Sequence, residues 1–172
     1  MSAFAKIRDH QAIIGLGTNI SPNENLRSAL YLLGKIVSIE TISNAWITPA
    51  VGSFGPDFLN AAVLVSTHFL YEELRNQILR PIETLLGRVR TKDPNAPRTI
   101  DLDVLIFDGE LFDQDLWDYA HMCVPVAEVL PDYKNPITGE SLKEIADRFL
   151  QSGRIAQSSL KLHRTSTPGY IV

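Results

Sequence analysis

The 172-residue sequence has only one cysteine, Cys123. An internal disulfide is therefore impossible, which is typical of a protein in a reducing compartment. No apolar run approaches the roughly 20 residues of a membrane span, and residues 1–9 lack the apolar stretch of a signal peptide. Basic residues are not in excess, because 16 lysines and arginines stand against 20 acidic residues. We expect a cytoplasmic protein with no membrane partner and no nucleic-acid partner.

The composition is that of a globular protein, with 45% hydrophobic and 21% charged residues. This length and balance suit one domain with a core of its own. We find no internal repeat and no low-complexity linker. We therefore expect a single domain over residues 1–172, with the weakly patterned segment 151–172 as a surface tail.

The hydrophobic pattern predicts a strand, a helix, two strands, a helix and a strand, in that order. A serine, a proline and a glutamate at 21–24 form a capping-box pattern at the start of the first helix, and Pro81 is expected to kink or shorten the second. The order is that of a ferredoxin-like βαββαβ sandwich, an α+β fold, here with a C-terminal helical extension. We expect the helices on one face of the sheet and a site on the other. The elements are expected at residues 12–17, 22–34, 37–47, 58–67, 70–86 and from 101 onward, with the extension helix at 141–150.

Three arginines and two carboxylates are concentrated before and within the last strand of this pattern. Arg88, Arg90 and Arg98 precede Asp101 and Asp103, whose side chains should project from the same face of the strand about 6–7 Å apart. Either group alone is more often a structural ion pair or a solvated strand face. Together they require another explanation, because like carboxylates on one face repel each other. A polyphosphate held by the arginines, with Mg²⁺ on the carboxylates, provides one.

Five short motifs resemble, in order and spacing, the signatures of the 6-hydroxymethyl-7,8-dihydropterin pyrophosphokinase family. They lie at residues 15–19, 48–52, 56–62, 87–90 and 97–103. The resemblance extends from about residue 13 to 107, with a fainter echo at 125–131. It implies the same α+β fold and the transfer of pyrophosphate from ATP to the pterin hydroxymethyl group, with AMP as co-product, in folate biosynthesis.

The resemblance also implies roles for the charged residues. Asp101 and Asp103 would hold two Mg²⁺ ions, which neutralise charge as phosphoryl transfer requires. Arg88 and Arg98 would clamp phosphate oxygens through their planar donor groups, and Arg90 would help to close the loop on the nucleotide. We therefore expect Arg88, Arg98, Asp101 and Asp103 to be catalytic.

The pterin site implied by the resemblance lies on the other motifs. The amide of Asn60 can donate to and accept from a pterin edge, Thr48, Pro49 and Val51 belong to a loop that reads the rest, and Phe58 flanks the ring. Without the shared motifs, a strand asparagine and a loop threonine are more often local capping or turn residues.

The chain also departs from the family pattern on the nucleotide side. Residues 99–147 contain no arginine, and five acidic residues lie between 108 and 118, where their charge repels a triphosphate at close range. Residues 93–96 stand where the family commonly has a tryptophan. His121 lies near the position of the family's stacking aromatic residue and is expected to replace it, although a lone histidine is more often a partly buried structural residue.

Three hypotheses follow from these observations. The first is a divergent pyrophosphokinase that binds ATP through fewer contacts. The second is a pterin-binding paralogue, regulatory or with altered transfer chemistry, that has lost normal ATP use. The third is a ferredoxin-like RNA- or effector-binding module without this site, which the acidic charge disfavours. The retained carboxylate pair favours the first hypothesis, an enzyme. We expect a pterin and ATP as its small-molecule partners, and a monomer or weak dimer as its oligomeric state.

Overall fold

The computed structural model describes residues 9–50, 55–92 and 96–163. Its centre is an antiparallel sheet in which β1 lies between β4 and β5. Two short strands, β2 and β3, pair in tandem with the free edge of β4, and two-residue strands extend the sheet at each side. The strands are β1 (His10–Thr18), β2 (Ser38–Ile42), β3 (Trp46–Thr48), β4 (Phe58–Thr67), β5 (Asp101–Phe107), β6 (Glu110–Leu111) and β7 (Ala156–Gln157).

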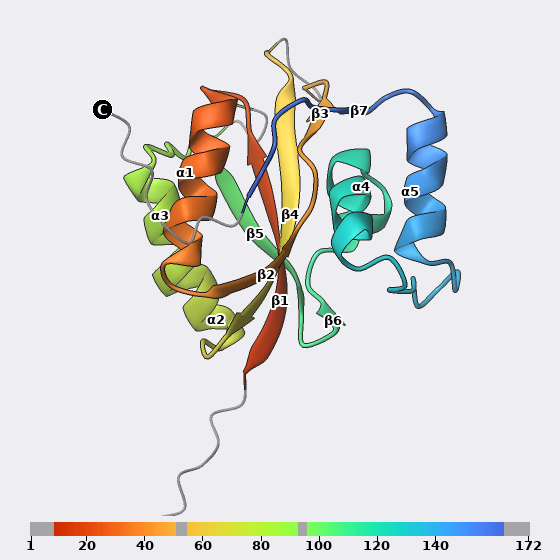
Figure 1. Cartoon of the computed structure of the whole chain (residues 1–172), viewed down its shortest axis with the longest axis horizontal. Helices are drawn as coiled ribbons and strands as arrows, with labels where there is room; N and C mark the ends of the chain where they lie inside the picture. Colours follow the sequence, from red (N-terminus) through yellow and green to blue (C-terminus); the bar gives the residue numbers. More distant parts are fainter. Residues whose placement is uncertain (1–8, 51–54, 93–95, 164–172) are drawn as a thin grey trace, which may run out of the picture.

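Helices cover both faces of this sheet (Figure 1). One face carries α1 (Pro22–Gly34) and a helical run made of α2 (Tyr71–Glu73), the π-helical η1 (Leu74–Leu79) and α3 (Arg80–Leu85). The other face carries η2 (Gln114–Trp117), α4 (Ala120–Val129) and α5 (Leu142–Gln151). Each layer buries its own hydrophobic core against the sheet. None of the described helices is both long and apolar enough to span a membrane.

The predicted α+β class with an antiparallel sheet is confirmed, but the expectation that one face stays free of helices is wrong. The missed element is α4, which packs Val124 and Val126 against Ile13 and Leu105 of the sheet. Residues 123–127 are all buried, so α4 lacks the alternation of apolar and polar sides that reveals a surface helix. Pro125, inside the helix, also argues against a helix in the sequence.

The predicted strand at 37–47 is divided into β2 and β3 by side-chain hydrogen bonds. The Ser43 hydroxyl accepts the N–H of Ala62 at 2.9 Å, and Glu128 of α4 accepts both the backbone and the side-chain N–H of Asn44. These bonds take the place of a regular ladder at residues 43–45. They also tie α4 to the sheet.

The two predicted helices form, with different details. Ser21 precedes α1 but has a φ of 41° and makes no side-chain cap bond, so the predicted capping box there is wrong. The chain is helical throughout 71–85, and the expected disturbance near Pro81 is the preceding π-helical turn, where the Arg80 N–H bonds to the carbonyl of Arg75. A π turn is a known way to absorb such an irregularity without ending the helix.

The C-terminal segment is partly integrated into the fold. Within the predicted tail, β7 pairs with β3, and the side chains of Ile155 and Leu160 are buried. Ser141 caps the extension helix α5 with a complete capping box, in which the Ser141 hydroxyl accepts the Glu144 backbone N–H and the Glu144 carboxylate accepts the Ser141 backbone N–H.

Candidate active site

A cavity of about 300 Å³ opens between the sheet and the start of α4. Its sheet side includes Gly15 and Gly17 of β1. A Cβ atom at Gly15 would lie 3.0 Å from Leu105 Cδ1, and one at Gly17 would lie 3.3 Å from Asn60 Oδ1. The neighbouring residues Ala12, Ile14 and Leu16 point into the opposite core, because side chains alternate along a strand. The absence of side chains at these two glycines therefore lets Leu105 and Asn60 pack closely against β1 at the cavity.

Most of the predicted site residues line this cavity. Those that do are Thr48, Pro49, Phe58, Asn60, Arg98, Asp101, Asp103 and His121. Arg88 and Arg90 do not line it and lie behind the β5 carboxylates, as described below. Val51 is outside the described residues. Segments far apart in sequence are thus brought together much as the motifs imply.

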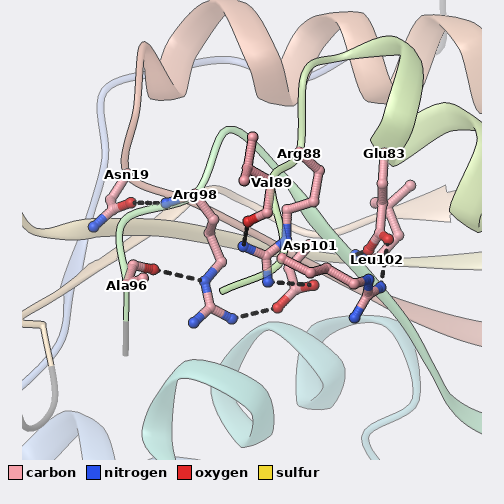
Figure 2. Close-up of polar contacts among 9 residues, drawn as sticks. Asn19, Glu83, Arg88, Val89, Ala96, Arg98, Asp101 and Leu102 are labelled. Carbon is pink, nitrogen blue, oxygen red and sulfur yellow. Dashed lines mark hydrogen bonds and ion pairs between the residues drawn. The ribbon is translucent and has the colours of Figure 1, made fainter. Parts of the chain in front are cut away.

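The carboxylate of Asp101 lies between two guanidinium groups (Figure 2). Arg98 Nη1 donates to one of its oxygens, and Arg88 Nη2 approaches the other at 3.5 Å. The Arg88 side chain is only 10% exposed, and its Nε atom is buried without a hydrogen-bond partner among the described residues. Arg98 is held further by a hydrogen bond from Nε to the Ala96 carbonyl and lies over the ring of Phe58, 5.6 Å from its centre. Asp101 is therefore charge-compensated before any ligand binds.

The carboxylate of Asp103 is in a different situation. It is solvent-accessible at the cavity and makes neither a hydrogen bond nor an ion pair to another described residue. Partial burial, and then the negative charges of Asp101 and Asp113, raise the pKa of Asp103 to about 6. Asp113 also lines the cavity, and its position beside Asp103 was not predicted. A cation bound here would relieve the repulsion that raises this pKa.

The residues present fit a magnesium site of the substrate-dependent kind. Within the described part of the chain, no group of three or more His, Cys, Asp or Glu side chains could hold a metal alone. Mg²⁺ is usually bound by one or two carboxylates together with substrate phosphates and water. Asp101 and Asp103 share one face of β5 at the cavity, as predicted, and supply such a pair.

Glu83 is a buried carboxylate behind this strand that the sequence analysis missed. Its side chain is 3% exposed. One oxygen accepts the N–H of Leu102 at 2.8 Å, between the two aspartates, and the other pairs with Arg90 Nη2 at 2.8 Å. Burial raises the pKa of Glu83, while the Leu102 hydrogen bond and the charge of Arg90 oppose that rise. The sequence signal for its burial is its place on the apolar side of a helix, four residues after Leu79.

The opposite side of the cavity carries hydrogen-bonding groups that are nearly fully buried. Asn60 Nδ2 donates to Thr48 Oγ1 at 2.9 Å, and the two residues are 4% and 7% exposed. This bond joins β4 to β3 and fixes the direction of the amide. Phe58 lies two residues before Asn60 on the same strand face and presents a flat ring.

His121 enters the cavity from the first turn of α4. Burial lowers the pKa of His121, Arg98 lowers it further, and the charges of Asp113 and Asp115 partly oppose this. The imidazole is therefore neutral at neutral pH. A neutral flat ring on α4 and the ring of Phe58 on β4 line the same cavity.

Comparisons with known proteins agree on one family. The family model for 7,8-dihydro-6-hydroxymethylpterin-pyrophosphokinase (HPPK) matches residues 13–131. A 2-amino-4-hydroxy-6-hydroxymethyldihydropteridine pyrophosphokinase from Synechocystis sp. is 30% identical over 150 residues, which cover 81% of this chain and 76% of that protein. Its counterpart from Methylorubrum extorquens is 34% identical over 155 residues, which cover 83% and 96%.

A solved structure supports the same fold. The wild-type HPPK-DHPS of Plasmodium falciparum superposes with a TM-score of 0.66 at 12% identity. The match covers 84% of this chain and 45% of that one, so this chain spans about half the length of that protein. At this identity the likeness shows the mixed α/β fold alone.

Proposed function

The chain belongs to the 7,8-dihydro-6-hydroxymethylpterin-pyrophosphokinase family, and we propose that its cavity transfers pyrophosphate from ATP to the hydroxymethyl group of 6-hydroxymethyl-7,8-dihydropterin. The products are AMP and the pterin pyrophosphate ester. The protein is thus a transferase of folate biosynthesis with ATP as co-substrate. One observation carries the proposal: Arg98, Asp101 and Asp103 line the same 300 Å³ cavity as Thr48 and Asn60.

The buried side of the cavity suits a pterin. Asn60 offers an amide whose direction is fixed by hydrogen bonds from Nδ2 to Thr48 Oγ1 and the Trp46 carbonyl. Its Oδ1 can therefore accept from a donor on the ring edge without reorganising. Phe58 and His121 supply flat surfaces for the two ring faces, and the neutral state of His121 avoids burying a charge against them. Pro49 completes this side, and we propose that Val51, which is outside the described residues, also contacts the pterin.

The β5 side suits the phosphates. The fork of Arg98 binds phosphate oxygens, with Arg88 and Arg90 as further cations for the nucleotide. Asp101 and Asp103 would hold two Mg²⁺ ions together with the triphosphate. When bound, these ions would neutralise the triphosphate charge and favour ionisation of the attacking hydroxyl. The protein's own part is to hold the hydroxymethyl group in line with the β-phosphorus and to present both carboxylates at the cavity.

The nucleotide contacts are few in this proposal. Asp113, which lies at the cavity, adds negative charge where a triphosphate must approach, and the chain has no arginine between Thr99 and Asp147. ATP binding should therefore depend steeply on Mg²⁺. Nothing in the fold or the comparisons favours a paralogue that has lost ATP use.

We further propose the ferredoxin-like assignment for the fold. It is supported by the order β5, β1, β4 and then β2 with β3 as one interrupted strand. We also propose a single domain over residues 1–172 with a tail at 151–172, present in the cytoplasm as a monomer or weak dimer.

The test is an assay of nucleotide products. The purified chain is incubated with 6-hydroxymethyl-7,8-dihydropterin, ATP and Mg²⁺, and AMP and ADP are separated by chromatography. We expect AMP that depends on both the pterin and Mg²⁺. Intact pterin binding by calorimetry without AMP would support the paralogue instead.

A further inference from the structure

The pterin side of the cavity has two walls that come from different layers of the fold. The strands β3 and β4 supply Thr48, Phe58 and Asn60, and the start of α4 supplies His121. α4 lies beside these strands (Figure 1) and packs on the sheet through apolar contacts. Apolar contacts are non-directional, so they do not by themselves fix the position of the helix relative to the strands. A flat ring bound between the two walls requires that spacing to be fixed.

A polar connection between α4 and the strands lies at Glu128, in the last turn of the helix. Its Oε2 atom accepts the backbone N–H of Asn44 at 2.6 Å, and its Oε1 atom accepts from Asn44 Nδ2 at 2.9 Å. Both carboxylate oxygens thus bind one residue that lies 84 positions away in the sequence. Two parallel bonds to a charged acceptor fix direction as well as distance. Both residues are exposed, so this connection contributes more to geometry than to stability.

The strand end of the connection is itself held firmly. Asn44 lies between β2 and β3, and the preceding Ser43 is 4% exposed. The Ser43 backbone N–H donates to the Ala62 carbonyl at 2.9 Å, and the Ser43 hydroxyl accepts the Ala62 N–H at 2.9 Å. The same hydroxyl donates to the Asn44 carbonyl at 2.7 Å. Ala62 follows Asn60 by two residues on β4, so Glu128 is joined to the strand that carries the pterin amide.

The position of Glu128 is electrostatically unfavourable for the helix alone. The C-terminal end of a helix carries partial negative charge, and a carboxylate there costs about 0.3–1 kcal/mol. The last turn of α4 has no basic residue to compensate. The two bonds from Asn44 offset this repulsion, so the charge of Glu128 is used for contact with the strands.

We propose that Glu128 is a positioning residue for the pterin, because it holds α4 at a fixed spacing from the strands and so sets the gap between His121 and Phe58. The inference rests on the proposed function, since it requires a pterin in this part of the cavity. Without the connection, α4 keeps its apolar packing but is free to shift on the sheet, and the ring loses contact with one wall. The nucleotide side should change little, because Asp101 and Asp103 lie on β5, which β1 separates from β4 and β3.

An exchange of the two polar groups separates positioning from a general loss of structure. In Glu128→Gln the new amide nitrogen faces Asn44 Nδ2, donor against donor, while the remaining oxygen can still accept the Asn44 backbone N–H. In Asn44→Asp two carboxylates face each other. The double variant Asn44→Asp/Glu128→Gln restores both bonds with the side-chain donor and acceptor reversed, at unchanged net charge. Glu140→Gln is the matched control, since it makes the same change in an exposed carboxylate that pairs with Arg148 on α5.

The experiment is calorimetric titration of each variant with two ligands. 6-Hydroxymethyl-7,8-dihydropterin is titrated in the presence of saturating Mg²⁺ and α,β-methylene-ATP, which cannot release AMP, and the nucleotide analogue with Mg²⁺ is titrated separately. We expect pterin affinity to fall about fivefold or more in Glu128→Gln and in Asn44→Asp, and nucleotide affinity to change by less than about twofold. The double variant should recover pterin affinity to within about twofold of the wild type. Glu140→Gln should bind both ligands as the wild type does.

Three results would overturn the inference and leave the proposed function standing. They are unchanged pterin affinity in both single variants, an equal loss for the pterin and the nucleotide, and a pterin loss that the double variant does not restore. A wild type that binds no pterin under these conditions would overturn the proposed function, and the inference with it.

Discussion

Arg98 and Asp101 form an ion pair at the start of β5, three residues apart on the chain, with one guanidinium nitrogen hydrogen-bonded to a carboxylate oxygen. Asp103 lies on the same face of the strand and has no ion pair to another described residue. The two carboxylates that the sequence presents as equivalent are therefore unequal in the folded protein. The Asp101 carboxylate forms ion pairs with two arginines. The Asp103 carboxylate is repelled mainly by Asp101 and Asp113.

This inequality predicts opposite effects on stability without metal. Asp101→Asn should lower the free energy of unfolding by about 1–3 kcal/mol. The Arg88 guanidinium would remain charged and largely buried, but its partner would be a neutral amide instead of a carboxylate. Asp103→Asn should raise it by less than about 1 kcal/mol at pH 8, since it removes repulsion that solvent already screens. Urea unfolding in EDTA measures both, and shifts of the same sign would contradict the assignment. Both variants should lose turnover.

Asn60→Ala should weaken pterin binding by about 1–3 kcal/mol, the cost of leaving a buried partner without its hydrogen bond. Nucleotide binding should change little, because Asn60 lies on the opposite side of the cavity from the β5 carboxylates. Thr48→Val is the companion variant, since it removes the hydroxyl that orients the amide and keeps the amide itself. It should cost less than Asn60→Ala. Equal losses for the pterin and the nucleotide in separate titrations would mean that Asn60 is structural.

Arg98→Ala should abolish measurable ATP binding, and Arg98→Lys should not restore it. A lysine ammonium is a point charge that cannot reproduce the bidentate fork, and it cannot bond at once to Asp101 and a phosphate in the same geometry. Arg80→Ala, an exposed arginine on α3 away from the cavity, controls for the loss of one positive charge. Titration of ATP with Mg²⁺ decides the matter. ATP affinity that survives Arg98→Ala would place the nucleotide elsewhere.

His121 should make the protein sensitive to mild acid. Its pKa lies below the ordinary value of 6.5 in the folded state, so the unfolded chain binds the proton more tightly. The neutral imidazole of His121 therefore makes its full contribution to the free energy of unfolding above about pH 6.5. This contribution declines as the pH falls toward the lowered pKa. His121→Phe, which keeps a flat ring but cannot be protonated, should show a shallower loss of unfolding free energy between pH 7 and 5.

The same comparison checks the role of His121 in the cavity. Asp113, Asp115 and Arg98 are the charged groups acting on the imidazole, and all three are retained in His121→Phe. As the pH is lowered from 7 to 5, pterin affinity should decrease in the wild type. The decrease should be smaller in His121→Phe. Parallel pH profiles for the two proteins would show that His121 does not titrate in this range.

The fold was predictable wherever a segment has one buried face or a turn signal. The glycine-punctuated apolar run of β1 and the amphipathic pattern of α1 both gave the correct element. α4 could not be found in this way, because its residues are buried on nearly all sides and include Pro125. Its absence from the prediction also explains why one face of the sheet was expected to be free of helices.

The site was predictable at the level of which residues share a face. Alternation along β5 correctly placed Asp101 and Asp103 together, and the motif order placed Asn60 and Arg98 at one cavity. Contacts that depend on three-dimensional proximity were not accessible. The helical position of Glu83 could have indicated that it is buried, but its bond to the Leu102 backbone joins residues 19 apart in the sequence and has no local signal.

The most direct test of the account is a ³¹P NMR spectrum of the complete reaction, with the wild type and with Asp103→Asn. For the wild type we predict AMP and an equal amount of a new diphosphate, whose inner phosphorus is coupled to the methylene protons of the pterin. Asp103→Asn should give neither. ADP in place of AMP, or free pyrophosphate without the methylene coupling, or unchanged turnover in Asp103→Asn, would contradict pyrophosphate transfer at this cavity.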